Sequence, residues 1–198
     1  FKPDIIHGHV IYPSGLIAHH LAQKKEVPYH LSEHWSKAAD FINNPVYGRK
    51  AKKVYEQSYK VYPVSHWLKE RVEKKLNKTK NFEVIPNVVN PDLFTYSPSK
   101  NREDKRLQLL VVMNLQHRLK RPDLIMKALQ ALKNEEQRKI EITFIGSGQK
   151  HNKWVERIEK LKLESTLNFK GTVPKNEVAK AMKKADFLLH PSETETFG

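Results

Sequence analysis

The sequence contains no cysteine, which excludes disulfide cross-links and thiolate chemistry and fits a reducing compartment. It has no run of about 18 consecutive apolar residues, the length that a membrane-spanning helix requires. It also lacks a Gly-x-Ser-x-Gly nucleophile elbow and an Asp-x-Asp pair that could carry a magnesium ion between phosphates. The motifs thus give no support to a serine hydrolase or a transferase that depends on such a pair.

Both ends of the sequence lack the features of natural termini. The chain begins at Phe1 without a methionine, and it stops a few residues after an apolar run at residues 185–190. The last segment, residues 191–198, combines carboxylates with a glycine just beyond that predicted buried strand, where open α/β sheets hold ligands. We therefore expect the 198 residues to be a stretch of a longer protein.

The chain is strongly basic, with 36 lysines and arginines against 22 acidic residues and a net charge of +14. Because the excess is spread over both halves, a single basic tail does not explain it. Three partners could: nucleic acid, an anionic membrane surface or a small phosphorylated ligand. Lysine-rich helix faces in water, such as residues 49–53 and 180–184, account for most of the charge without any partner.

Short apolar runs alternate with segments of helical periodicity along the whole chain. This alternation predicts an α/β fold with parallel sheets. The predicted strands are residues 4–9, 29–32, 61–64, 82–85, 107–113, 140–145, 167–169 and 187–190. The predicted helices are residues 16–25, 49–59, a helix after Ser65, a helix opened by Pro122, 154–163 and 177–185.

A change of composition divides the two series. Residues 86–106 hold three prolines, several asparagines and serines and a charged stretch, which is typical of a linker. We expect residues 1–86 and 107–198 to form two Rossmann-like domains, both incomplete, joined by residues 87–106. A surface excursion within one domain is the alternative.

Two segments are candidates for binding phosphate. Gly146-Ser147-Gly148 follows a predicted strand and precedes a helix, so its backbone amides could approach an anion; a simple tight turn explains it equally well. Arg118, Lys120 and Arg121 lie between the strand at 107–113 and the helix opened by Pro122. Cations at that edge suit a diphosphate, although an exposed basic loop is also an ordinary feature.

Four histidines near the N-terminus raise the alternative of a metal site. His7 and His9 share one strand face because side chains alternate along a strand, and His30 and His34 lie nearby in sequence, in and just after the next predicted strand. A zinc or iron site would need a further ligand, for which Asp4 and Glu33 are available. A metallohydrolase therefore stays open at this point.

Residues 84–94, which read VIPNVVNPDLF, resemble the "IPNGVD…F" motif of the retaining group 1 glycosyltransferases, family 4, which have the GT-B fold. Other segments resemble further motifs of this family, and they occur along the chain in the family's order. The likeness covers nearly the whole chain. The other matching segments are residues 4–15 ("DIIHAH…PSG"), 28–34 ("PYVLTEH"), 63–65, 144–148 ("FIGDGP"), 169–173 ("FxGxV") and 185–198 ("ADxxxxPSxxExFG").

The resemblance implies two Rossmann-like domains, of which the C-terminal one binds a nucleotide sugar. It implies that His9 lines the catalytic centre and that Glu195, the first carboxylate of a Glu-x7-Glu motif, binds the donor sugar. The second glutamate would lie past Gly198. Lys120 matches the lysine that neutralises the donor diphosphate; the arginine that usually assists it is replaced by Asn114, so we expect Arg118 or Arg121 to supply the second charge.

The remaining implied contacts come from loops. Ser14 and Gly15 would lie beside His9 on the acceptor side, and His34 aligns with the histidine of "TEH". Backbone contacts to the nucleobase would come from residues 171–173. The donor-side residues implied by the resemblance are Gly146, Gly148, Gly171, Thr172, Val173, Thr196, Phe197 and Gly198.

The sequence-based hypothesis is a fragment of a glycosyltransferase that moves a hexose from a nucleotide-diphosphate sugar to a glycan or lipid-linked acceptor, with retention of configuration. No cofactor and no metal are expected. The expected location is cytoplasmic, in contact with the inner membrane face through basic helices. Alternatives are a sugar-nucleotide epimerase, a phosphorylase or a nucleic-acid-binding module. The last is disfavoured because Tyr47, Tyr55, Tyr59 and Tyr62 have near-helical spacing, typical of core packing.

Overall fold

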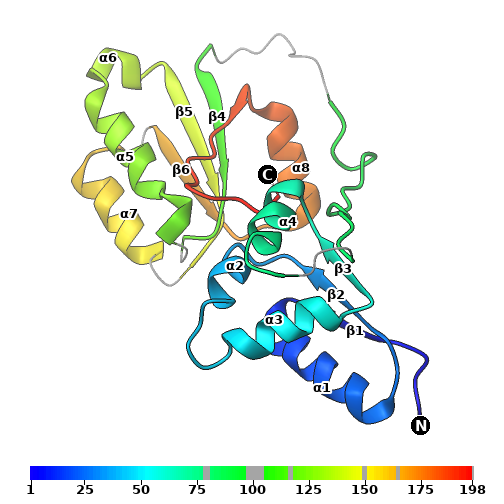
Figure 1. Cartoon of the computed structure of the whole chain (residues 1–198). Helices are drawn as coiled ribbons and strands as arrows, with labels where there is room; N and C mark the ends of the chain where they lie inside the picture. The colour runs from blue at the N-terminus through cyan, green and yellow to red at the C-terminus, as the bar shows by residue number, and fades with distance from the viewer. Residues whose placement is uncertain (78–80, 97–104, 116–117, 149–150, 164–165, 198) are drawn as a thin grey trace. The chain divides into compact units, whose positions relative to one another are not determined.

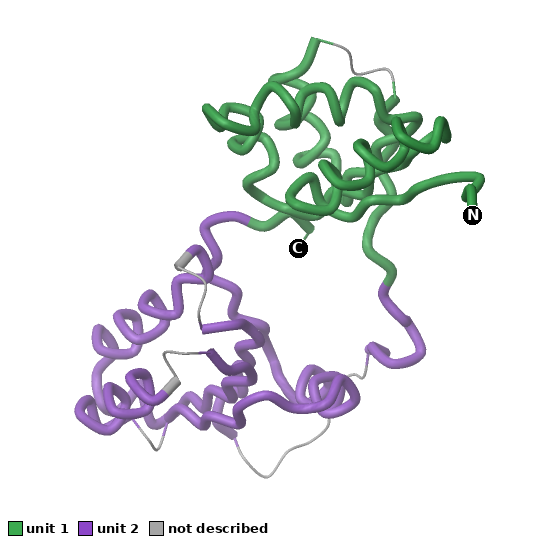
Figure 2. The backbone as a smooth tube through the Cα atoms, turned by 90° about the horizontal axis from the view of Figure 1, so that it is seen from below, with its two compact units in different colours: residues 1–88, 195–198 green, residues 89–194 purple. Residues whose placement is uncertain are grey.

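The computed structural model describes residues 1–77, 81–96, 105–115, 118–148, 151–163 and 166–197. The chain divides into two compact units, shown in different colours in Figure 2. Unit 1 comprises residues 1–88 with 195–198, and unit 2 comprises residues 89–194. No helix among the described residues is both long and apolar enough to cross a membrane.

Unit 1 is built on a three-stranded parallel sheet in the order β1-β2-β3 (Figure 1). Helices connect successive strands, as parallel pairing requires. The strands are β1 (Ile6–His9), β2 (Tyr29–Glu33) and β3 (Lys60–Pro63). The helices are α1 (Leu16–Lys25), α2 (Ala38–Phe41), α3 (Gly48–Gln57) and α4 (His66–Glu73), and a tight turn, η1 (Ile11–Gly15), precedes α1.

The core of unit 1 lies between its sheet and its helices. Val54 and Tyr55 of α3 and Leu68 and Val72 of α4 are fully buried there. Helix α4 begins after Ser65, whose side-chain oxygen accepts a hydrogen bond of 3.2 Å from the amide of Leu68. The helix therefore begins where it was predicted, and this N-cap satisfies an amide that the helix itself leaves unpaired.

The strand predicted at residues 82–85 is reduced to a single bridge. Phe82 pairs with Val61, and the amides of Glu83 and Ile85 donate to the carbonyls of Val61 and Pro63 at 2.9 and 3.1 Å. The segment is therefore extended beside β3 without forming a regular strand. Pro63 of β3 accounts for this, because proline has no amide hydrogen to donate to the carbonyl of Glu83 and continue the ladder.

Unit 2 contains a four-stranded parallel sheet in the order β6-β5-β4-β7. Its fully parallel pairing confirms the predicted α/β class. The strands are β4 (Leu107–Val112), β5 (Ile140–Ile145), β6 (Leu167–Gly171) and β7 (Phe187–Leu188). The helices are α5 (Pro122–Ala131), α6 (Asn134–Gln137), α7 (His151–Lys160) and α8 (Lys175–Lys184), with a 3-10 turn, η2 (Arg118–Lys120), before α5.

The strand predicted to be buried at the end of the chain lies at the edge of the sheet instead. Phe187 and Leu188 are 62% and 52% exposed, and within the described residues β7 pairs only with β4. The apolar sequence of this strand led to the wrong prediction, because an apolar run does not reveal which strand of a sheet is outermost.

Candidate nucleotide site and histidine face

A pocket of about 600 Å³ lies in unit 2 at the carboxyl ends of β4, β5 and β6. In parallel sheets these ends all lie on one edge, where open α/β folds hold their ligands. The volume is in the range of small-molecule sites. The pocket is lined by Val112, Met113, Asn114, Ile145, Gly146, Ser147, Gly148, Thr172, Val173 and Val178. Five of these residues, Asn114, Gly146, Gly148, Thr172 and Val173, are predicted site residues.

Backbone hydrogen bonds join the loops that form this pocket. The amide of Leu115 donates to the carbonyl of Ser147 at 3.1 Å, and the amide of Gly146 donates to Gly171 at 2.8 Å. The loops after β4, β5 and β6 are thus held side by side. This explains how glycines from separate motifs come to share one surface with Asn114 and Thr172.

Gly146 is required by the close approach of two backbones. Its φ of 142° is one that residues with side chains rarely adopt, and a Cβ atom there would lie 1.8 Å from the carbonyl oxygen of Met113. Gly171 also has a positive φ, 65°, but a Cβ atom there would meet nothing within 4 Å. The two glycines therefore differ: only Gly146 is excluded from substitution by direct overlap.

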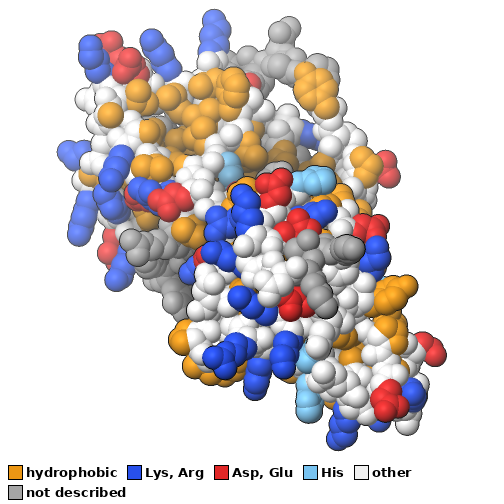
Figure 3. Space-filling model, in the orientation of Figure 1, with side chains coloured by type: hydrophobic (Ala, Val, Ile, Leu, Met, Phe, Trp, Pro, Cys, Tyr) orange, Lys and Arg blue, Asp and Glu red, His pale blue; other side chains and the backbone are white. Residues whose placement is uncertain are grey.

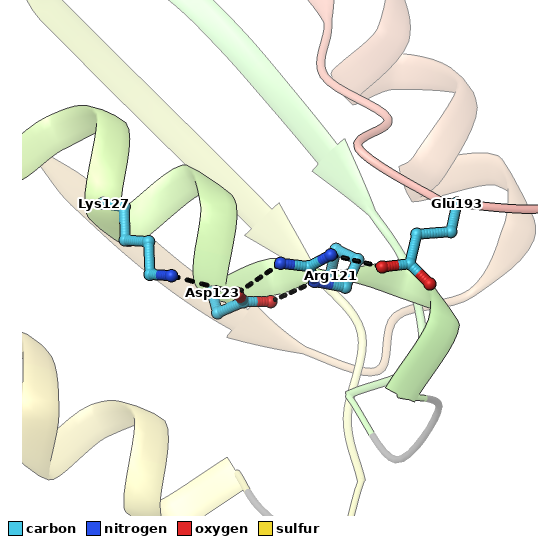
Figure 4. A network of polar contacts seen from close by, with 4 residues as sticks. All are labelled: Arg121, Asp123, Lys127 and Glu193. Carbon is cyan, nitrogen blue, oxygen red and sulfur yellow. Dashed lines mark hydrogen bonds and ion pairs between the residues drawn. The ribbon is translucent and has the colours of Figure 1, made fainter.

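The basic segment leads from β4 into α5. Arg118 starts η2 and its side chain lies outside the described residues, while Lys120 is half-buried at the end of η2. Arg121, in the left-handed conformation with a φ of 48°, donates two hydrogen bonds of 3.0 Å to Asp123 and pairs with Glu193 (Figure 4). Hydrogen bonds from Arg121 lower the pKa of Asp123, and bonds to Asp123 and Glu193 raise the pKa of Arg121.

The segment after β7 lies against this basic turn. The amide of Glu193 donates to the carbonyl of Leu119 at 2.9 Å, in addition to the ion pair of its carboxylate with Arg121. Glu195 and Thr196, the next predicted donor-side residues, are half-buried, Phe197 is exposed, and Gly198 lies outside the described residues. The basic turn at residues 118–121 and the segment at residues 191–194, which were predicted separately, are therefore neighbours within unit 2.

The predicted acceptor-side residues lie at the carboxyl end of β1. The amide of His9 donates to Ser14 Oγ at 3.0 Å, so the turn η1 folds back onto the strand. Gly15 is buried, and a Cβ atom on it would lie 3.1 Å from Leu31 and 3.2 Å from the carbonyl of Val10. The local structure places His9 and Ser14 together; their catalytic and binding roles stay predictions.

The four histidines form a row across one face of the unit 1 sheet. The rings of His7 and His9 stack with centroids 4.5 Å apart, and His34 and His30 lie 6.0 Å from His9 and 6.2 Å from His7. Among the residues that the structure describes, no group of three or more potential ligands could hold a metal ion. Side chains on one strand face thus come together as predicted, but the geometry gives the metallohydrolase alternative no support.

We expect the stability of unit 1 to fall under mild acid because of His7. Desolvation, and then repulsion from His9 and His30, lower the pKa of His7 below its ordinary 6.5. Since the unfolded chain binds this proton more tightly, the stability that His7 contributes is present above pH 6.5 and lost as the pH falls through the folded-state pKa. Melting temperatures recorded across this range should show the slope, and His7→Gln should flatten it. His20→Gln, an exposed change on α1, is the control; equal slopes in both variants would contradict the assignment.

The tyrosines did not all follow the predicted core packing. Lysines and arginines lie over the visible face of both units in Figure 3 and do not follow one stripe. Among the tyrosines, Tyr55 is fully buried, but Tyr59 is 67% exposed and stacks on His30, and Tyr47 is exposed as well. The prediction for Tyr47 and Tyr59 was wrong because both lie outside α3, which begins at Gly48 and ends at Gln57.

Glu33, a residue with several hydrogen-bond partners, was predicted only as an available metal ligand. It is fully buried and accepts four hydrogen bonds. The signal was present in the alternation along β2, where Tyr29, Leu31 and Glu33 all point to the buried side. A carboxylate on the buried face of a strand needs several donors, and these could not be identified from sequence.

Two family models together match the whole chain. Residues 94–198 match the family described as "Glycosyl transferases group 1", and residues 1–93 match "Glycosyltransferase Family 4". An uncharacterized glycosyltransferase of Methanocaldococcus jannaschii is 28% identical over 98% of this chain and 51% of its own length. The first match covers more than half of the chain, which therefore belongs to the group 1 glycosyltransferases.

Solved structures share the fold at low identity. HepE of Anabaena in complex with UDP-glucose has a TM-score of 0.76 and 19% identity, covering 98% of this chain and 55% of HepE. Sucrose-phosphate synthase of Thermosynechococcus elongatus has a TM-score of 0.78 and 17% identity, covering 98% of this chain and 52% of the synthase. The chain thus spans about half the length of the relatives that it matches.

Proposed function

We propose that this chain forms part of a glycosyltransferase and that unit 2 holds the nucleotide of its sugar donor. The observation that carries the proposal is the pocket at the carboxyl edge of the unit 2 sheet, which five of the predicted site residues line. A second support is HepE, a structural relative that was solved with UDP-glucose. The proposed reaction transfers a hexose to a glycan or lipid-linked acceptor with retention of configuration.

In this proposal the pocket binds the nucleotide through main-chain and polar side-chain groups. Gly146 and Gly148 leave room for close approach of the ligand, and Thr172 and Val173 contact the base. Lys120, with Arg118 or Arg121, neutralises the diphosphate as it becomes the leaving group. Fixed cations beside the negative charge that develops on the diphosphate lower the activation barrier for breaking its bond to the sugar. The proposed mechanism uses no metal and no cofactor.

In this proposal His9 and Ser14 of unit 1 line the acceptor side, and Glu195 binds the transferred sugar. The bond between the anomeric carbon and the phosphate oxygen breaks while the acceptor hydroxyl forms the new bond on the same face. The acceptor's proton passes to the leaving phosphate, so the charges balance. We propose a cytoplasmic location for such an enzyme. Its basic helices would contact the inner face of the membrane.

Nucleotide binding tests this proposal directly. Calorimetry should show that the chain binds UDP or GDP and binds the free nucleoside much more weakly, because the diphosphate supplies the charge. Lys120→Ala should weaken diphosphate binding about 10-fold or more, the usual effect of losing one charge-assisted contact. Lys183→Ala removes the same charge from an exposed position on α8 and should leave affinity unchanged.

Two outcomes would contradict the proposal. Equal losses in the Lys120 and Lys183 variants, together with a steep salt dependence, would indicate non-specific binding of polyanions and favour the nucleic-acid alternative. Absence of any diphosphate binding would remove the assigned role of the pocket. Hydrolysis of a panel of nucleotide sugars then identifies the donor.

A further inference from the structure

The carboxylate of Glu33 ends β2 in the interior of unit 1, with none of its surface exposed. Its Oε2 accepts hydrogen bonds from the Ile11 amide at 2.9 Å and from the Tyr55 hydroxyl at 2.7 Å. Its Oε1 accepts from the amides of His34 and Trp35 at 3.0 and 2.9 Å. Both oxygens therefore have two donors each, which is the full capacity of a carboxylate.

The chemistry of these donors favours the ionised carboxylate. Three of them are backbone amides, which can donate but never accept, and only Tyr55 could reverse its role. In the described part of the chain, no lysine or arginine pairs with Glu33. Burial raises the pKa of Glu33, while the hydrogen bonds from Tyr55, Trp35, Ile11 and His34 oppose that effect.

These hydrogen bonds connect two loops that would otherwise be separate. Ile11 begins the turn η1, whose Ser14 hydroxyl accepts from the His9 amide. His34 and Trp35 begin the segment that leaves β2. One carboxylate thus joins the chain just beyond β1 to the chain just beyond β2, at the two places from which the predicted acceptor-side residues come.

We propose that Glu33 is the positioning residue of the acceptor side: it fixes the backbone that presents His9, Ser14 and His34, and it does so through the Ile11, His34 and Trp35 amides. The catalytic consequence of this inference rests on the proposed function. The role of Glu33 in holding the backbone does not. Glu33 itself contacts no substrate, since it is fully buried.

The structure offers variants that separate positioning from general stability. In Glu33→Gln, the amide oxygen can face one pair of donors only, so its NH₂ group opposes either the Ile11 amide or those of His34 and Trp35. Tyr55→Phe keeps the carboxylate and removes one donor. Tyr29→Phe is the matched control, because Tyr29 is also a buried tyrosine whose hydroxyl donates to α3, at the Val54 carbonyl, without touching Glu33.

The first measurement is amide hydrogen exchange in the chain as it stands. In Glu33→Gln, exchange at Ile11, His34 or Trp35 should accelerate at least 10-fold relative to Leu31 in the middle of β2. Tyr55→Phe should give a smaller acceleration at Ile11, and Tyr29→Phe should give none. If the three amides exchange in Glu33→Gln as they do in the unmodified chain, the proposal is wrong.

The second measurement is turnover in the longest form of the protein that carries this chain. Glu33→Gln should lower kcat at least 10-fold with the KM for the nucleotide sugar unchanged, because the donor pocket lies in unit 2. A loss no greater than that of Tyr29→Phe at the same melting temperature would overturn the catalytic part. Absence of transfer by the unmodified protein would reject the proposed function instead, and the exchange data would still decide the role of Glu33.

Discussion

Gly146→Ala is expected to abolish nucleotide binding by unit 2. The added Cβ would lie 1.8 Å from the Met113 carbonyl oxygen, so the loop after β5 must move away from β4. That movement breaks the hydrogen bond between Gly146 and Gly171 and opens the pocket that both loops line. We expect UDP or GDP affinity to fall below detection by calorimetry, and unit 2 to lose several kcal/mol of stability in denaturant unfolding, about the size of a severe packing defect.

Gly171→Ala provides the matched control for this substitution. It makes the same chemical change at another glycine of positive φ in the neighbouring loop, but the new Cβ meets no atom within 4 Å. Only the conformational penalty of about 1–2 kcal/mol remains. If Gly171→Ala damages binding as severely as Gly146→Ala does, backbone strain rather than overlap with β4 governs the pocket.

Glu193→Gln is expected to strengthen binding of a nucleoside diphosphate, and Arg121→Gln to weaken it, each several-fold. In the structure Arg121 is held between Asp123 and Glu193 (Figure 4). A diphosphate attracted to this turn would meet the Glu193 carboxylate as a repelling charge, so its removal favours the ligand while loss of the guanidinium disfavours it. Titrations at low and moderate salt should show both shifts, larger at low salt because these groups are partly exposed.

The control for this pair is Glu177→Gln. Glu177 forms a similar exposed ion pair with Lys180 on α8, so its neutralisation changes the net charge by the same amount without altering Arg121. Equal gains from Glu177→Gln and Glu193→Gln would show a general charge effect. A loss of affinity in Glu193→Gln would instead assign Glu193 a positioning role for the terminal segment.

The regular elements could be predicted where their periodicity is long enough to be specific. The bounds of α1 and β5 agree with the prediction, and Pro122 opens α5 as expected. The helices α2 and α6 were missed, since each has only four residues and shows no complete apolar repeat. Short elements are formed by tertiary contacts, which local sequence does not record.

The unit 2 pocket could be predicted in part because its glycines and the segment at residues 171–173 lie in recognisable motifs. Val178 was missed, because it reaches the pocket from α8 through packing between elements distant in sequence. Glu33 was likewise taken only as an available metal ligand. Its donors come from η1, from α3 and from the chain after β2, a combination that only the folded structure brings together.

The strand order of unit 2 has a consequence for its synthesis on the ribosome. The amide of Gln108, on the first strand of this sheet, donates at 2.8 Å to Asp186, 78 residues later, and β7 pairs with β4 itself. This pairing in unit 2 therefore cannot form until Leu188 has emerged. The three strands described in unit 1 have all been synthesised by Pro63. Translation thus gives unit 1 time to fold first, before the late closing of a long-range contact in unit 2.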